Sequence, residues 1–162
     1  MASALLSNPI MQTPFPHHYV VRSVVGPEPE VVIETAGVAP LRTALPAEFG
    51  GAGNRWSPET LFVAAVADCY AITFRGIASK SKLAWTSLRL DVQGTLDRVS
   101  DVTRFTEIHI HAHLFVPECA SESLATRVLT KAEQTCLITR SLTAKIELTM
   151  SVDCLEKRAP AA

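Results

Sequence analysis

Alternating apolar and polar residues mark three strands in the second half of the chain. The segments 87–97, 106–116 and 145–153 each place an apolar side chain at every second position. In the middle segment, Ile108, Ile110, Ala112 and Leu114 alternate with Glu107, His109, His111 and His113. A period of two over such lengths is typical of antiparallel strands with one buried face.

Shorter apolar segments near the start of the chain predict a hairpin. Residues 17–25 and 31–34 are both rich in valine or isoleucine, and they flank the turn sequence Gly26-Pro27-Glu28-Pro29. Two such runs around a Gly/Pro turn indicate two paired strands. A third short strand is expected over residues 41–45, followed by a glycine-rich loop.

Two segments have helical patterns. Ser57 suits an N-cap, Pro58 suits the first helical position, and Glu59 is favourable near the positive end of the helix. We expect this helix to run to about Leu83, with a bend at Gly76. Apolar residues lie on nearly all its sides, so we expect this helix to be buried in the middle of the fold. A second helix is expected over residues 120–136, with a short further piece over 137–142. The sequence therefore predicts an α+β fold, with antiparallel sheets, a long buried central helix and a second helix on a sheet face.

Composition limits the classes of protein to consider. The 162 residues are 48% hydrophobic and 19% charged, with a formal net charge of −1. We expect a flexible arm over residues 1–15 and one domain over 16–156. The charge balance argues against a nucleic-acid partner. The longest fully apolar run, residues 61–67, is too short to span a membrane, and no signal peptide begins the sequence, so we expect a cytoplasmic protein with no membrane partner.

Four cysteines offer the most reactive chemistry, and none belongs to a C-x-x-C pair. Cys69 lies within the first helix and Cys136 at the end of the second, and each could be a packed thiol or a reactive one. If the two meet, one thiolate can attack a peroxide to give a sulfenic acid, and the other can condense with it to a disulfide. Their spacing in the sequence does not say whether they meet. Cys154 follows the apolar register of the last strand and is interpreted as a packed thiol, and Cys119 as an incidental loop residue.

Two further patterns carry less specific signals. His109, His111 and His113 share one face of a strand with Glu107, where two imidazoles could bind zinc, although polar residues on an outward face are ordinary. We interpret this face as solvated. The glycines at 50, 51 and 53 match neither nucleotide-binding motif, and a mobile loop is the better interpretation.

Two segments resemble signatures of the OsmC/Ohr family. The first is Phe49-Gly50-Gly51-Ala52-Gly53-Asn54-Arg55-Trp56-Ser57-Pro58-Glu59, continuing to Cys69 ten residues beyond the glutamate. The second is Lys131-Ala132-Glu133-Gln134-Thr135-Cys136-Leu137-Ile138-Thr139-Arg140-Ser141-Leu142. With the strand order, the resemblance extends over about residues 17–153.

This resemblance implies an intertwined homodimer with two active sites, each shared between the subunits. Cys69 would be the nucleophile that attacks an organic hydroperoxide, and Cys136 the resolving cysteine. Glu59 would pair with an arginine that stabilises the Cys69 thiolate. A thiol reductant, in the best-known branch a lipoylated protein, would reopen the disulfide. No cofactor or metal would be needed.

One departure from the family pattern concerns the arginine. The hydroperoxide-resistance branch carries it in a Gly-Gly-Arg-like turn between the first two strands, whereas residues 26–29 hold no arginine here. Arg22, four residues earlier, is our first choice, ahead of Arg42 and Arg55. The missing turn arginine leaves an alternative open, a binding protein of the same fold that holds a hydrophobic small molecule and has little or no peroxidase activity.

Overall fold

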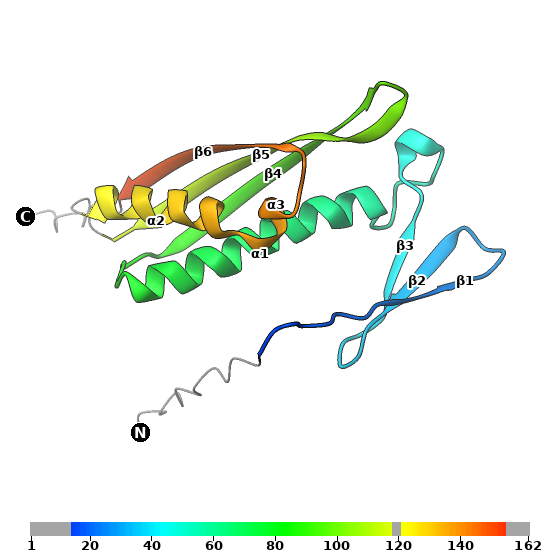
Figure 1. The fold of residues 1–162 in the computed structure, drawn as a ribbon, viewed down its shortest axis with the longest axis horizontal. Coiled ribbons are helices and arrows are strands. Elements are labelled where there is room, and N and C mark those ends of the chain that lie inside the picture. Colours follow the sequence, from blue (N-terminus) through cyan, green and yellow to red (C-terminus); the bar gives the residue numbers. More distant parts are fainter. Residues whose placement is uncertain (1–13, 118–120, 155–162) are drawn as a thin grey trace, which may run out of the picture. The chain divides into compact units, whose positions relative to one another are not determined.

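A computed structural model describes residues 14–117 and 121–154. Within these residues the chain forms an α+β fold with two three-stranded sheets and three α-helices (Figure 1). It separates into two compact units, Met1–Trp56 and Ser57–Ala162. The expected arm over residues 1–15 falls almost entirely outside the described residues.

The first unit is a small antiparallel sheet in the order β1-β2-β3. Its strands are β1 (Arg22–Val25), β2 (Glu30–Glu34) and β3 (Leu41–Ala44). The expected hairpin and third strand are confirmed, but β1 begins at Arg22, because only residues from there on pair with β2. Within the described part of this unit, Thr43 is the one buried side chain. This sheet therefore has almost no apolar core of its own.

The second unit packs two helices against one face of a larger sheet (Figure 1). The helices are α1 (Pro58–Lys80), α2 (Glu122–Thr135) and the short α3 (Leu137–Arg140). The strands are β4 (Ser87–Val99), β5 (Val102–Val116) and β6 (Lys145–Cys154), with β5 in the middle. The predicted order of elements is confirmed.

One sheet pairing differs from the expectation of antiparallel strands. β4 and β5 pair antiparallel, but β6 runs parallel to β5. Alternation shows that one face of a strand is buried and does not show the direction of its neighbour. Here α2 and α3 carry the chain back along the sheet, and such a helical crossover returns the next strand in the same direction.

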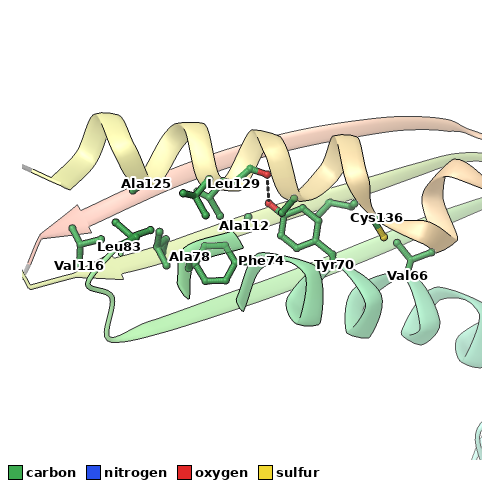
Figure 2. Packing of buried hydrophobic residues seen from close by; sticks show 14 of the residues in the cluster. Val66, Tyr70, Phe74, Ala78, Leu83, Ala112, Val116, Ala125, Leu129 and Cys136 are labelled. Atoms are coloured by element: carbon green, nitrogen blue, oxygen red, sulfur yellow. Dashed lines mark hydrogen bonds between the residues drawn. The ribbon is translucent and has the colours of Figure 1, made fainter. Parts of the chain in front are cut away.

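The core lies between the helices and the sheet (Figure 2). α1 contributes Val66, Tyr70, Phe74 and Ala78, which recur every four residues and so form one stripe. The Tyr70 hydroxyl donates a hydrogen bond of 3.0 Å to the Leu129 carbonyl of α2. This bond satisfies the buried hydroxyl and fixes α1 against α2.

The opposite side of α1 is not buried, in contrast to the expectation of a helix covered all round. Ile72, for example, keeps 58% of its surface exposed. Phe62 and Ile77 pack against the edge of the core, but Ile72 is left uncovered by the chain. By length and composition, α1 is also apolar enough to cross a membrane, which the short uninterrupted run in the sequence did not indicate.

Candidate functional site

The start of α1 is fixed by a capping box. The Ser57 hydroxyl accepts from the Thr60 backbone N–H at 3.2 Å, and the Ser57 N–H donates to the Thr60 hydroxyl at 2.8 Å. The predicted N-cap and the proline at the first helical position are confirmed. This cap sets the point from which both Glu59 and Cys69 are positioned along the helix.

Cys69 lies at the border of the buried stripe of α1. It follows Val66 by three residues and precedes Tyr70, so its side chain packs against the core while remaining half-buried. Its thiol is free. Cys69 is therefore not sealed inside the core.

Cys136 lies at the junction of α2 and α3, where the backbone is extended for one residue. It is fully buried, and its thiol is also free. Figure 2 shows its sulfur pointing from the end of α2 toward α1, between Tyr70 and Val66. Extended backbone at this one residue ends α2 and directs the side chain into the core.

The structure brings the two free thiols into contact. The side chain of Cys136 lies beside the thiol of Cys69. Burial raises the pKa of Cys136, and the contact with Cys69 raises it further, while the N–H and hydroxyl of Thr139 act in the opposite direction. The fold therefore supplies the proximity that sequence spacing left open.

Tyr70 borders this pair of thiols. Burial raises the pKa of the Tyr70 hydroxyl, and the nearby Glu133 and Cys136 raise it further. The side chain is thus a neutral hydrogen-bond donor at physiological pH, held by the Leu129 carbonyl. The sequence pattern identified Tyr70 only as part of an apolar stripe and gave no signal of its place beside Cys136.

Glu59 presents an unusual carboxylate in the first turn of α1. Its Oε2 atom is buried and has no hydrogen-bond partner among the described residues. A buried carboxylate oxygen without a donor is costly, so this atom calls for a cationic or hydrogen-bonding partner. At 1.5 Å of rise per residue, the ten residues to Cys69 also separate the two by about 15 Å along the helix. Glu59 and Cys69 of one chain therefore do not share one small site.

Two arginines of the first unit are already paired. Glu30 binds Arg42 at 3.0 Å and Arg55 at 2.9 Å. The Arg42 hydrogen bond and the charges of both arginines lower the pKa of Glu30. Arg22, on the exposed strand β1, forms no ion pair within the described residues. The structure describes Arg22 in the first unit and Glu59 with both cysteines in the second.

The remaining sequence candidates form no reactive group. His111 Nδ1 lies 2.5 Å from the Thr149 hydroxyl, and His113 Nε2 lies 2.7 Å from Asp153 Oδ2 on the polar face of the sheet. Across residues 14–117 and 121–154, no group of three His, Cys, Asp or Glu side chains is arranged to hold a metal ion.

Of the two other cysteines, the structure describes only Cys154. Cys154 is disulfide-bonded, which corrects the expectation of a packed free thiol. Strand periodicity reports which face a residue occupies and not which distant cysteine it meets. Cys119 lies outside the described residues.

Comparison with known proteins places this chain among relatives of the same fold. Residues 51–151 match the family model described as OsmC-like protein. The uncharacterized protein YmaD of Bacillus subtilis is 25% identical over 135 residues, which cover 82% of this chain and 90% of YmaD.

Solved structures agree in fold at lower identity. An OsmC-like protein of unknown function from Vibrio cholerae has a TM-score of 0.77 and 15% identity, covering 84% of this chain and all of that one. An organic hydroperoxide resistance protein OsmC from Legionella pneumophila has a TM-score of 0.69 and 22% identity, covering 86% and 99%. The family match spans more than half of the sequence and includes both free cysteines, and we conclude that this chain belongs to the OsmC-like protein family.

Proposed function

We propose that this protein is a thiol peroxidase that reduces organic hydroperoxides to alcohols, with Cys69 as the attacking sulfur. The observation that carries the proposal is the contact between two free thiols that lie far apart in the sequence. Cys69 is half-buried, whereas Cys136 is fully buried. This is the arrangement that a nucleophile and a resolving thiol require.

The reaction has two sulfur steps. The Cys69 thiolate attacks the terminal oxygen of the hydroperoxide, the O–O bond breaks, and the departing alkoxide takes a proton to become the alcohol. Cys69 is oxidised by two electrons to a sulfenic acid. The Cys136 sulfur then attacks the Cys69 sulfur, an S–S bond forms, and the hydroxyl group leaves as water. A dithiol reductant restores both thiols and is itself oxidised to a disulfide.

Glu59 and Arg22 are proposed as the groups that support the Cys69 thiolate. The unpartnered buried oxygen of Glu59 supports an arginine partner at that position. Glu30 holds Arg42 and Arg55, which leaves Arg22 as our choice from the first unit. A guanidinium group is only a few ångström across, so one arginine does not bridge groups about 15 Å apart on the same helix.

That separation favours sites shared between two subunits. In a homodimer with two α1 helices running in opposite directions, Glu59 of one copy would approach Cys69 of the other. The uncovered apolar face of α1 and the nearly coreless first sheet are the surfaces that a second copy would bury. A lipid environment is disfavoured because Asp68 and Arg75 are exposed in the middle of the same helix. We therefore propose a homodimer in the cytoplasm.

The substrate class follows from the surroundings of Cys69. Most side chains of α1 on either side of it are apolar, and an apolar lining favours an alkyl or fatty-acid hydroperoxide over hydrogen peroxide. The organic hydroperoxide resistance protein of Legionella pneumophila supports the same class. We propose a dithiol reductant, such as a lipoylated protein, and no cofactor.

The test is turnover of cumene hydroperoxide with dihydrolipoamide as reductant. Cys69→Ser is expected to abolish turnover, because the attacking sulfur is gone. Cys136→Ser is expected to accumulate a sulfenic acid on Cys69 that dimedone traps. Wild-type turnover in Cys69→Ser would overturn the assignment.

A second function is favoured by one observation, the absence of any arginine paired with Glu59 among the described residues. If the Cys69 thiolate has no such support, the same fold could bind a hydrophobic small molecule with inert cysteines. A protein of this kind would retain its affinity for a hydrophobic ligand when both cysteines are replaced by serine, and the wild type would not consume cumene hydroperoxide.

A further inference from the structure

The polar face of the larger sheet carries a histidine pair that the proposed function does not use. The helices α1 and α2 pack on one face of this sheet (Figure 1). On β5, Ile108, Ile110 and Ala112 point to that face and are buried. His109 and His111 occupy the alternate positions, so their side chains lie on the opposite face, away from the core that contains the two free thiols. This pair is therefore separate from the candidate peroxidase site.

The geometry of the pair suits a shared ligand. The two imidazole rings lie with their centroids 4.0 Å apart. His111 Nδ1 is hydrogen-bonded to the Thr149 hydroxyl of β6, which leaves the Nε2 atom of His111 for another partner. His109 Nε2 is buried and has no hydrogen-bond partner among the described residues. A covered polar nitrogen without a partner is costly, so this atom calls for a proton donor or a metal ion.

The third histidine of the strand is engaged elsewhere. His113 Nε2 lies 2.7 Å from Asp153 Oδ2 of β6. The His113 ring contacts the Phe115 ring, with centroids 4.3 Å apart, whereas the His111 ring contacts that of His109. His113 therefore provides an internal comparison, because it shares the strand and the face but has a partner for its Nε2 atom.

Charge around the pair favours a cation over an anion. The outward positions of residues 87–95, 107–115 and 145–153 carry four carboxylates and two cations: Asp91, Glu107, Glu147, Asp153, Arg89 and Lys145. Asp91 lies across from His111 on β4, and Glu147 lies across from His109 on β6, where it is also paired with Lys145. With neutral imidazoles, this face has an excess of negative charge, which attracts cations.

We propose that His109 and His111 together bind one transition metal ion of the class that prefers imidazole, such as Ni²⁺, Cu²⁺ or Zn²⁺, each through its Nε2 atom. His111 donates its Nδ1–H to the Thr149 hydroxyl, an arrangement by which proteins orient metal-binding imidazoles. The exposed His111 side chain is free to turn its Nε2 atom toward the ion, and the buried His109 Nε2 gains the partner that it lacks.

The number of protein ligands decides what kind of metal site this is. Structural zinc sites use four protein ligands and catalytic ones three. Over residues 14–117 and 121–154, no group of three His, Cys, Asp or Glu side chains is arranged to hold a metal ion. The histidine pair supplies two ligands, and water completes the coordination. The ion is therefore exchangeable, and the fold does not depend on it.

The test is calorimetric titration of the full chain with Ni²⁺ at neutral pH. We expect His109→Gln and His111→Gln each to weaken Ni²⁺ binding at least about tenfold, because removal of even an outer-shell partner of a metal ligand costs about 10–100-fold in affinity. His113→Gln is the matched control and should bind as wild type does, since Asp153 already holds its Nε2 atom. Mg²⁺, which prefers oxygen ligands, should not compete.

A second measurement locates the ion on wild type alone. Zn²⁺ should shift the ring nitrogen signals of His109 and His111 in an NMR titration and leave those of His113 in place. All the variants retain both free thiols, so a Ni²⁺ site at the thiols cannot account for a difference between them.

Three results would overturn the inference. One is a wild type that binds no Ni²⁺. Another is a His109→Gln variant that binds Ni²⁺ as tightly as wild type, which would place the ion elsewhere. The third is an equal loss in all three histidine variants, or equal Zn²⁺ shifts of all three rings, which would assign the binding to the charge of the whole face and not to the pair.

Discussion

Replacing Ile72 with aspartate should separate the proposed dimer. Ile72 lies on the uncovered face of α1 with 58% of its surface exposed in the single chain. Full burial of an isoleucine side chain contributes about 1.5–3 kcal/mol, so covering the exposed part contributes roughly 0.9–1.7 kcal/mol per chain. The twofold symmetry of a dimer doubles this contribution to roughly 2–3.5 kcal/mol.

The carboxylate adds its own penalty. An unpaired charge buried in an interface costs several kcal/mol more. Together these effects should weaken dimerisation by more than about a hundredfold, since each 1.4 kcal/mol is a factor of ten. Light scattering coupled to size exclusion, at micromolar concentration, should report a dimer for wild type and a monomer for Ile72→Asp.

A matched control comes from the tip of the β4–β5 hairpin. Val102 is also a branched aliphatic residue and is 57% exposed, but it does not lie on α1. Val102→Asp should remain dimeric. A wild-type monomer, or an Ile72→Asp variant that stays dimeric, would refute the reasoning about this helix face.

Three other predictions concern single side chains. Arg22→Met should lower the rate of peroxide reduction at least about tenfold through loss of a charge-assisted hydrogen bond, whereas Arg42→Met should not, because Arg42 is paired with Glu30; stopped-flow consumption of cumene hydroperoxide would measure both, and equal rates would argue against a special role for Arg22. Tyr70→Phe should lower the free energy of unfolding by about 0.5–1.5 kcal/mol, because the hydrogen bond from Tyr70 to the Leu129 carbonyl is lost in the core; urea unfolding that matches wild type would contradict this. The Glu30 carboxyl should titrate below 4.5 in an NMR pH series, because the Arg42 hydrogen bond lowers its pKa, so its contribution to stability is present above its unfolded value and is lost as the pH falls through the lowered one. A midpoint at or above 4.5 would show that the arginine pairs do not persist in solution.

Most of the elements could be predicted from the sequence because their patterns are local. Serine and proline before α1 specify where the helix begins, and alternation over residues 106–116 identifies the buried face of β5. The direction of β6 could not be predicted this way, because alternation is the same in parallel and antiparallel strands. The exposure of Ile72 could not be predicted either, since an apolar pattern does not show whether the same chain or another one covers the helix.

The candidate site was also predictable from the sequence only in part. Cys69, Cys136 and Glu59 could be selected from residue type and motif, but the meeting of the two thiols depends on how α1 packs against α2 and α3. The place of Tyr70 beside Cys136 likewise depends on packing. The disulfide at Cys154 depends on a contact in space that strand periodicity does not encode.

The most direct test of the peroxidase proposal is a single oxidation of the protein with its free thiols reduced. One equivalent of cumene hydroperoxide is added, the remaining thiols are counted, and the linked peptides are identified by mass spectrometry. The account predicts rapid loss of two thiols and a new bond between Cys69 and Cys136, the pair already in contact. No loss of thiols over minutes, or a bond that omits Cys69, would contradict it.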